Sequence, residues 1–191
     1  YWVVDVTRGT RTRLTFDNYS RGWFCGWTPD GHHVLYSSTD SSQYRVMVKA
    51  ADGSGQATEL VNGIDADYSP DGKSIIYATR EGKKQDFDLW SVGTEQGARP
   101  QPQQFLVTPK DERSPTFSPD GNYVAYSSDE SGRFEIYVKP FPGGEGKFQV
   151  SVGGGVLPVW SRKGDELFYS WGEDLMVVQV KAKPSLSMGQ P

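Results

Sequence analysis

Histidine and serine would be the signs of hydrolytic chemistry in this chain, and their positions do not support it. The two histidines, His32 and His33, are neighbours directly after a Pro-Asp-Gly turn. Neighbouring residues of a strand point to opposite faces, so this pair cannot chelate one metal ion. No Gly-x-Ser-x-Gly segment is present to form a nucleophile elbow. We interpret both histidines as exposed residues that begin a strand, and we predict no catalytic residue and no enzymatic activity.

Four acidic residues are the candidates for binding a cation. Asp65 and Asp67 have the spacing that places two carboxylates on one face of a strand. Together with Asp111 or Glu112 they could line a central channel and hold a hard cation such as Ca²⁺. The alternative is a polar, hydrated channel lining. We expect no cofactor, with Ca²⁺ in the channel as the competing possibility.

The glycine-rich segments and the single thiol have structural interpretations. Segments 143–146 and 153–155 are followed by no helix signal, so they fit a hairpin and a connecting link rather than a phosphate-binding loop. Cys25 is the sole cysteine, which excludes a disulfide within the chain and a site with several cysteine ligands. We expect its thiol to be packed.

A four-part motif recurs along the chain and predicts the elements that would position these residues. Each copy has an aromatic residue four before a glycine, an aliphatic residue three after it and a tyrosine five after it. Copies lie about 40–50 residues apart, the period of a four-stranded β-propeller blade. Asp30, Asp71 and Asp120 precede the glycine, so we assign them to turns. The copies are Trp27/Gly31/Val34/Tyr36, Tyr68/Gly72/Ile75/Tyr77, Phe117/Gly121/Val124/Tyr126 and Trp160/Gly164/Leu167/Tyr169.

The predicted fold is therefore all-β: a propeller of four-stranded antiparallel blades, in this chain a partial propeller of about four to five blades. The aromatic residues and tyrosines of the motif are expected to pack between blades. The end pieces supply two and three strands, one more than a single blade needs. The chain is then either a fragment of a ring of about six to eight blades or a small ring with an extra edge strand. We place the propeller at 1–180, with blade pieces 1–15, 23–61, 64–108, 113–151 and 156–180, and a tail or linker at 181–191.

One rim of such a propeller is the better candidate for recognition. The Pro-Asp-Gly turns share one rim and are chemically alike, whereas the loops between second and third strands and the links between blades share the other. Binding residues concentrate on loops that a rigid scaffold holds. The link 16–22 mixes aromatic residues with a guanidinium, a composition favoured at interface hot spots, although an ordinary polar loop is the alternative. The candidate partner-binding residues are Tyr19, Arg21, Trp23, Asp65, Asp111 and Arg113.

Composition narrows the classes of partner. A net charge of −4 with scattered basic residues gives no footprint for nucleic acid. The longest apolar run, Leu175–Val178, is too short to cross a bilayer. The chain opens on Tyr1, already in an apolar strand, and so resembles a piece of a longer protein. We expect a protein or peptide partner, and self-association through open blade edges is a further possibility.

Several segments resemble a known repeat. The Phe/Trp-Ser-Pro-Asp-Gly turns, the Tyr-Ser-Ser strand ends (36–38 and 126–128) and Ile136-Tyr137-Val138 resemble the TolB-like β-propeller repeat over Trp23 to Val180. Segment 135–143, with the glycines and the Pro-Val-Trp-Ser that follow, is similar to C-terminal propellers of bacterial serine/threonine protein kinases. The last copy departs from the pattern, because Arg162 and Lys163 replace Pro-Asp. The TolB-like resemblance implies an extracytoplasmic, periplasmic platform for protein binding. The resemblance to kinase propellers implies a non-catalytic sensing or interaction module.

The sequence therefore predicts a non-catalytic binding or sensing module that contacts a protein or peptide. Two alternatives stay open. The chain could be the substrate-gating propeller of a prolyl-oligopeptidase-type peptidase or another enzyme, or it could bind a small molecule or sugar in its channel.

Overall fold

The computed structural model describes residues 1–16, 25–40, 43–82, 84–94, 101–181 and 187–189, and in these ranges the chain forms strands and turns without a helix. Nothing in the described ranges is a long apolar helix of the kind that spans a bilayer. The chain divides into two compact units, Tyr1–Ala66 and Asp67–Pro191. The boundary between them falls within one strand, β7.

The first unit contains a two-stranded and a four-stranded antiparallel sheet. The smaller sheet pairs β1 (Trp2–Val4) with β2 (Arg11–Arg13). The larger has its strands in chain order: β3 (Cys25–Trp27), β4 (His33–Asp40), β5 (Gln43–Ala50) and β6 (Thr58–Asn62).

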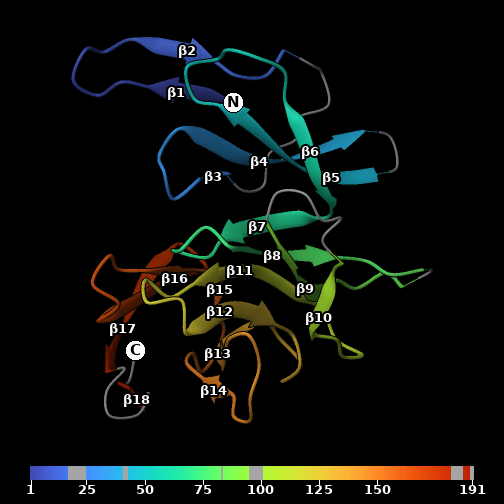
Figure 1. The fold of residues 1–191 in the computed structure, drawn as a ribbon. Helices are drawn as coiled ribbons and strands as arrows, with labels where there is room; N and C mark the ends of the chain where they lie inside the picture. Colours follow the sequence, from blue (N-terminus) through green and yellow to red (C-terminus); the bar gives the residue numbers. More distant parts are fainter. Residues whose placement is uncertain (17–24, 41–42, 83, 95–100, 182–186, 190–191) are drawn as a thin grey trace. The chain divides into compact units, whose positions relative to one another are not determined.

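The second unit contains three four-stranded sheets, each again in chain order (Figure 1). The first sheet consists of β7 (Ile64–Tyr68), β8 (Ser74–Thr79), β9 (Asp88–Gly93) and β10 (Gln103–Leu106). The second consists of β11 (Glu112–Phe117), β12 (Tyr123–Ser128), β13 (Glu135–Pro140) and β14 (Phe148–Gln149). The third consists of β15 (Val156–Trp160), β16 (Glu166–Trp171), β17 (Asp174–Lys181) and β18 (Ser187–Met188).

These up-and-down sheets are propeller blades, which confirms the predicted fold class. Within the segment 181–191, predicted as a tail or linker, Ser187 and Met188 pair with Lys181 and Val180 as the fourth strand of the last blade. A two-residue edge strand is too short to show alternating hydrophobicity, so the sequence carries no signal for it. The limits of the domain, 1–180, stay a prediction.

The repeated turns have the predicted chemistry. In the turn from β7 to β8, Ser69 Oγ and Lys73 N both donate to Asp71 Oδ1, at 2.6 and 3.0 Å. Gly72 follows with a φ of 70°, in the left-handed region that favours glycine. Asp30 and Asp120 accept the same bonds in their own turns. In the last turn, where Lys163 replaces the aspartate, Asp165 accepts the hydroxyl bond of Ser161 instead.

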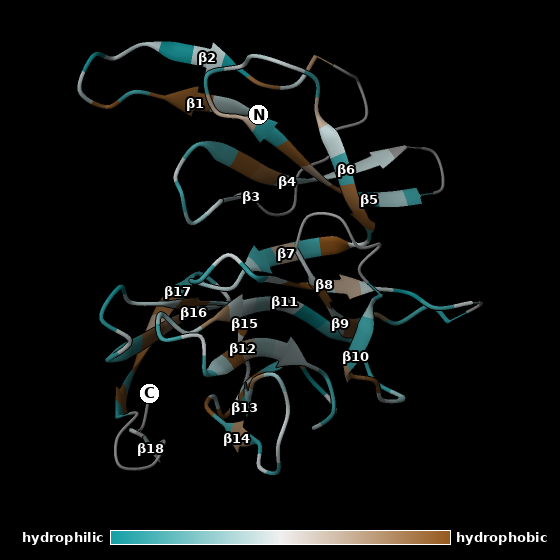
Figure 2. Ribbon diagram, in the orientation of Figure 1, coloured by the Kyte–Doolittle hydropathy of each residue, from teal (hydrophilic) through white to brown (hydrophobic). Residues whose placement is uncertain are grey.

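The motif tyrosines form the predicted buried layer. Tyr36, Tyr77, Tyr126 and Tyr169 are each at most 4% exposed. The aromatic residues before the turns are less uniform: Phe117 and Trp160 are buried, Tyr68 is half-buried and Trp27 is 53% exposed. Hydrophobic residues lie mainly on the strands, whereas the connecting turns are mostly hydrophilic (Figure 2).

The strands β7, β11 and β15, each the first of its sheet, all carry one residue with left-handed backbone. Asp65, Ser114 and Leu157 have φ values of 50°, 51° and 56°, and each lies three residues before the aromatic residue of its motif. The pairing register shifts across Ser114 and across Leu157, as in a β-bulge. A left-handed conformation costs an L-residue about 1–2 kcal/mol. The bulge therefore recurs in the first strand of successive blades, and a residue other than glycine occupies its left-handed position.

Leu157 offers a test of this strain, because it is 48% exposed and loses only about half of a full leucine burial on truncation. We expect Leu157→Gly to raise the free energy of unfolding by about 0.5–1 kcal/mol, since glycine adopts this φ without strain. Val159, 55% exposed in the same strand, is the matched control. Its φ is not left-handed, so Val159→Gly should destabilise by about 1 kcal/mol. Urea unfolding of both variants measures the difference, and a loss of stability in both would contradict the strain.

Candidate functional site

The structure places half of the predicted partner-binding residues. Tyr19, Arg21 and Trp23 lie outside the described residues. Asp65 belongs to the first unit, where it is buried and its amide donates to Ser37 Oγ at 3.2 Å. Asp111 and Arg113 lie in the second unit, on either side of Glu112 at the start of β11. They are at the rim formed by the blade links and the loops between second and third strands. We call this the loop rim of the second unit (107–111, 150–155, 80–82, 84–87 and 129–134).

Arg113 and Asp111 form a fork-shaped ion pair on this rim. Arg113 Nε donates to Asp111 Oδ1 and Oδ2 at 3.0 and 2.9 Å, and Nη2 donates to Oδ2 at 2.5 Å. Asp111 Oδ1 also accepts the amide of Phe87 at 3.0 Å. The amide of Asp111 donates to Asp129 Oδ1 at 3.1 Å. The pair therefore ties the link before β11 to the loops of two neighbouring blades.

Two aromatic rings contact the guanidinium group of Arg113. The Cζ atom of Arg113 lies 5.0 Å from the ring centroid of Phe87 and 5.8 Å from that of Phe134. Arg80 lies over the same Phe87 ring at 4.1 Å. Phe87 is 2% exposed, whereas the Arg113 side chain is 36% exposed. A guanidinium stacked on aromatic rings and paired through a planar fork is restricted in its rotamer, and about a third of this side chain is exposed.

A buried acidic group lies between the two residues of this ion pair in the sequence. Glu112 is fully buried, and its Oε1 accepts the hydroxyl groups of Thr108 and Ser128 at 2.6 and 3.2 Å. Its Oε2 has no hydrogen-bond partner among the described residues. Burial raises the pKa of Glu112 to about 7, and the nearby carboxylate of Asp88 adds to the rise, while Thr108, Ser128 and Lys84 oppose it.

The acid that opens the third strand of a blade holds the link that follows. Asp88, the first residue of β9, accepts from Lys84 Nζ and from the amide of Thr108. Glu135, the first residue of β13, accepts the hydroxyl of Ser151 and the amide of Gly153. Both carboxylates are buried. These two carboxylates bind the blade links to the strands of the blades. The link that leads to Arg113 is therefore held in place by contacts with the sheet.

The acids that could have formed a cation site are separated. Asp67 Oδ2 accepts from Thr116 Oγ1 and from the amide of Phe117, at the far end of β11 from Glu112. Five residues of strand span roughly 16 Å. Burial raises the pKa of Asp67, against the hydrogen bonds from β11. Over the described ranges, no three His, Cys, Asp or Glu side chains come together as a metal site would require.

The other singled-out residues have local roles. His32 is exposed, and His33 is half-buried with its Nδ1 4.0 Å from Asp30 Oδ2 in the same turn. Segment 143–146 lies in the connection from β13 to β14, and segment 153–155 is the link into β15, as predicted. The side chain of Cys25 lies outside the described residues.

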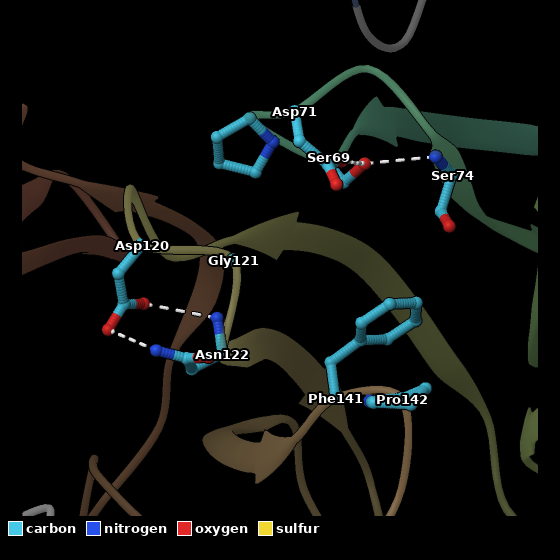
Figure 3. Close-up of a pocket in the computed structure, with 9 residues that line it drawn as sticks. Ser69, Asp71, Ser74, Asp120, Gly121, Asn122, Phe141 and Pro142 are labelled. Carbon is cyan, nitrogen blue, oxygen red and sulfur yellow. Dashed lines mark hydrogen bonds between the residues drawn. The ribbon is translucent and has the colours of Figure 1, made fainter.

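A pocket on the opposite rim was missed by the sequence interpretation. It has a volume of about 520 Å³ and lies between the β7–β8 turn and the β11–β12 turn (Figure 3). Phe141 and Pro142, in the connection after β13, complete its wall. The repeated turns suggested a chemically uniform rim, and no sequence signal places Phe141 beside two turns of other strands.

The fold defines the chain as a β-propeller, and the comparisons with known proteins show which propellers it is similar to. The crystal structure of TolB from Acinetobacter baumannii matches with a TM-score of 0.74 at 16% identity, over 100% of this chain and 48% of that one. The uncharacterized protein Atu1656 of Agrobacterium fabrum is 28% identical over 185 residues, 88% of this chain and 60% of that protein. The uncharacterized peptidase YuxL of Bacillus subtilis is 29% identical over 118 residues, 58% of this chain and 17% of that protein.

No protein-family model matches the sequence. The chain thus spans about 60% of the Agrobacterium relative and a sixth of the Bacillus one. The predicted resemblance to TolB-like propellers is confirmed at the level of the fold. The narrower resemblance to kinase propellers stays a prediction.

Proposed function

We propose that this chain is a non-catalytic binding module whose loop rim contacts a protein or peptide through Arg113. The observation that carries the proposal is the arrangement of this guanidinium, which Asp111, Phe87 and Phe134 hold while its side chain stays 36% exposed. Ordering a long side chain on binding costs about 0.5–1.5 kcal/mol, and here the fold has already ordered it. Arginine and aromatic residues are also the types enriched at interface hot spots.

The chemistry of the partner follows from the group presented. A planar guanidinium donates to a carboxylate or carbonyl oxygen at its edge and stacks with an aromatic ring on its face. We therefore propose a partner segment that offers an acidic or aromatic side chain. The TolB-like resemblance adds an extracytoplasmic, periplasmic location to this proposal. Tyr19, Arg21 and Trp23 stay candidate contacts, and so does self-association through open blade edges.

Site-specific photo-cross-linking tests which rim binds. A photoreactive amino acid at Ser131, exposed on the loop rim, should give a discrete adduct in the cells that produce the protein. The same residue at Lys163, exposed on the turn rim, should not. We expect Arg113→Ala to reduce the Ser131 adduct at least about tenfold, because a hot-spot arginine contributes about 2 kcal/mol or more.

Matched variants separate binding from folding. Arg162→Ala removes an exposed arginine from the turn rim and should leave the adduct unchanged. Arg113→Lys keeps the charge but loses the fork and the stacking, so it should fall between wild type and Arg113→Ala. Equal adducts from both rims, or an Arg113→Ala variant that binds as wild type with unchanged stability, would contradict the proposal.

The Bacillus relative favours a second function. Its description as a peptidase suggests that a chain of this kind can be the propeller part of a larger hydrolase. A fluorophosphonate probe applied to the complete protein distinguishes the two. Labelling of a serine outside these 191 residues would favour the peptidase. The absence of labelling in a folded preparation that still forms the Ser131 adduct would favour the binding module.

A further inference from the structure

The pocket on the turn rim of the second unit has walls of two chemical kinds. Asp71 and Asp120 contribute carboxylates from two successive turns, and Asn122 and Ser74 add polar groups. Phe141, Pro70 and Pro142 form the apolar wall. In Figure 3 the β7–β8 turn lies at the top, the β11–β12 turn at the left, and Phe141 with Pro142 at the lower right. The volume of about 520 Å³ lies in the usual range for small-ligand pockets, roughly 300–1,000 Å³.

Both carboxylates are ionised at neutral pH. The hydroxyl of Ser69 and the amide of Lys73 hold the pKa of Asp71 below its usual range. For Asp120, burial raises the pKa, but hydrogen bonds from Ser118 and Asn122 outweigh it and the net direction is down. Lys73 lies beside Asp71 but does not line the pocket, and no lysine or arginine is among the residues that do.

The turn leaves one oxygen of Asp71 for a ligand. Its two hydrogen bonds from the turn, from Ser69 Oγ and Lys73 N, both end on Oδ1. Asp120 is more fully used, because Ser118 and the amide of Asn122 donate to Oδ1 and the Asn122 side chain donates to Oδ2.

Tertiary packing fixes the shape of the pocket. The ring of Phe141 packs edge-on against Phe117 at 4.8 Å between centroids and lies 5.8 Å from Phe105. Its amide donates to Asn122 O at 2.8 Å. A Cβ atom on Gly121 would lie 3.5 Å from Pro70 Cδ, so the two turns approach each other closely. The ring and the two turns therefore form a preformed surface rather than a flexible loop.

We propose that this pocket binds an organic cation, an ammonium or guanidinium group on an apolar stem. Asp71 and Asp120 supply the negative charge, and the Phe141 ring offers an apolar and aromatic wall for the stem and the cation. The source is either the side chain of a lysine or arginine in a peptide or a free amine. The pocket is on the opposite rim from Arg113, so this proposal does not depend on the function proposed above.

Amide chemical shifts of the 191-residue chain test the proposal with N-acetyl-arginine amide as the probe. We expect saturable shifts at Gly72, Gly121, Asn122 and Phe141, with a Kd on the order of millimolar for so small a ligand. N-acetyl-citrulline amide has nearly the same shape without the charge and should bind about tenfold more weakly. A pentapeptide with a central arginine that binds tighter than the single residue indicates a peptide source, and equal affinity indicates a free amine.

Matched substitutions connect the binding to the pocket. Asp71→Asn and Asp120→Asn keep the turn acceptors and should each raise the Kd about two- to fivefold, as expected for one exposed charge. Phe141→Leu should weaken binding by a similar factor. Asp30→Asn makes the same change in an equivalent turn that does not line the pocket and should have no effect. Melting temperatures check that every variant is folded.

Three results would overturn the proposal. These are the absence of saturable shifts at those four amides, equal binding of the citrulline compound, and equal weakening by Asp30→Asn. None of them affects the cross-linking expected at Ser131, so the two proposals fail independently.

Discussion

Replacing Glu112 by glutamine should raise the free energy of unfolding at pH 8 by about 3 kcal/mol and leave it nearly unchanged at pH 4. Glu112 is fully buried, and one of its oxygens has no hydrogen-bond partner among the described residues. Ionising this carboxyl group places a negative charge in the protein interior, where water and hydrogen bonds do not fully stabilise it. Glutamine has the same shape and carries no charge at any pH.

The sign follows from the pKa values of Glu112 in the two states. Burial raises the pKa of Glu112 from 4.5 to about 7, so the folded protein binds this proton more tightly than the unfolded chain does. As the pH rises between these values, the unfolded chain releases the proton first, and the folded state loses stability. The loss is complete above pH 7, and each pKa unit corresponds to about 1.4 kcal/mol. The glutamine variant is free of this loss.

Urea unfolding at intervals from pH 4 to pH 8 measures the effect. Glu135→Gln is the matched control, because Glu135 is also buried at the start of β13 but accepts from Ser151 and from the amide of Gly153. An amide nitrogen facing those donors should destabilise the protein, the opposite of the effect at Glu112. A stability difference between wild type and Glu112→Gln that does not grow with pH would show that Glu112 is not a buried acid of raised pKa.

Replacing Gly154 by alanine should destabilise the protein by about 2–4 kcal/mol. Gly154 lies in the link between β14 and β15 and has a φ of 136°, a conformation that L-residues rarely adopt. A Cβ atom there would also lie 2.3 Å from ring atoms of Trp171. The backbone strain and the displacement of the indole both oppose folding. Thermal and urea unfolding give the magnitude.

Three further variants separate the two causes. Gly143→Ala has neither a contact within 4 Å nor a left-handed φ, and should change stability by less than about 0.5 kcal/mol. Gly132→Ala has a φ of 95° and open space, and should cost about 1–2 kcal/mol from strain alone. In a Trp171→Ala background, Gly154→Ala should then cost about as much as Gly132→Ala. A full cost without the indole would assign the whole effect to the backbone.

The repeat motif predicts the blades because its chemistry is local. A Pro-Asp-Gly sequence bends the chain by its own preferred dihedral angles and side-chain hydrogen bonds, so Asp71 and Gly72 act within a few residues of their own positions. The motif then fixes the position of the tyrosine in the next strand, and Tyr77 and Tyr126 are buried as expected, each within a run of buried residues. The same logic fails at β18, whose two residues are too few to alternate.

The candidate sites depend on contacts between blades, and only part of them could be predicted. Asp111 and Arg113 could be predicted because Asp111 lies on a link between blades and Arg113 lies directly before the third complete blade. Their aromatic support was not, because Phe87 and Phe134 come from loops of two different blades. The Phe141 pocket was missed for the same reason: its acids come from turns about 50 residues apart, and its ring comes from a third connection.

The amino-acid sequence alone determined the strands, the turns and the buried tyrosine layer of this propeller, since these depend on backbone preferences and on hydrophobic alternation over a few residues. The tertiary structure decided which charged groups are paired, which acid is buried without a full set of donors, and where a pocket opens. Those properties depend on how side chains from separate blades meet, and burial and electrostatic energies change steeply over distances that sequence spacing does not specify.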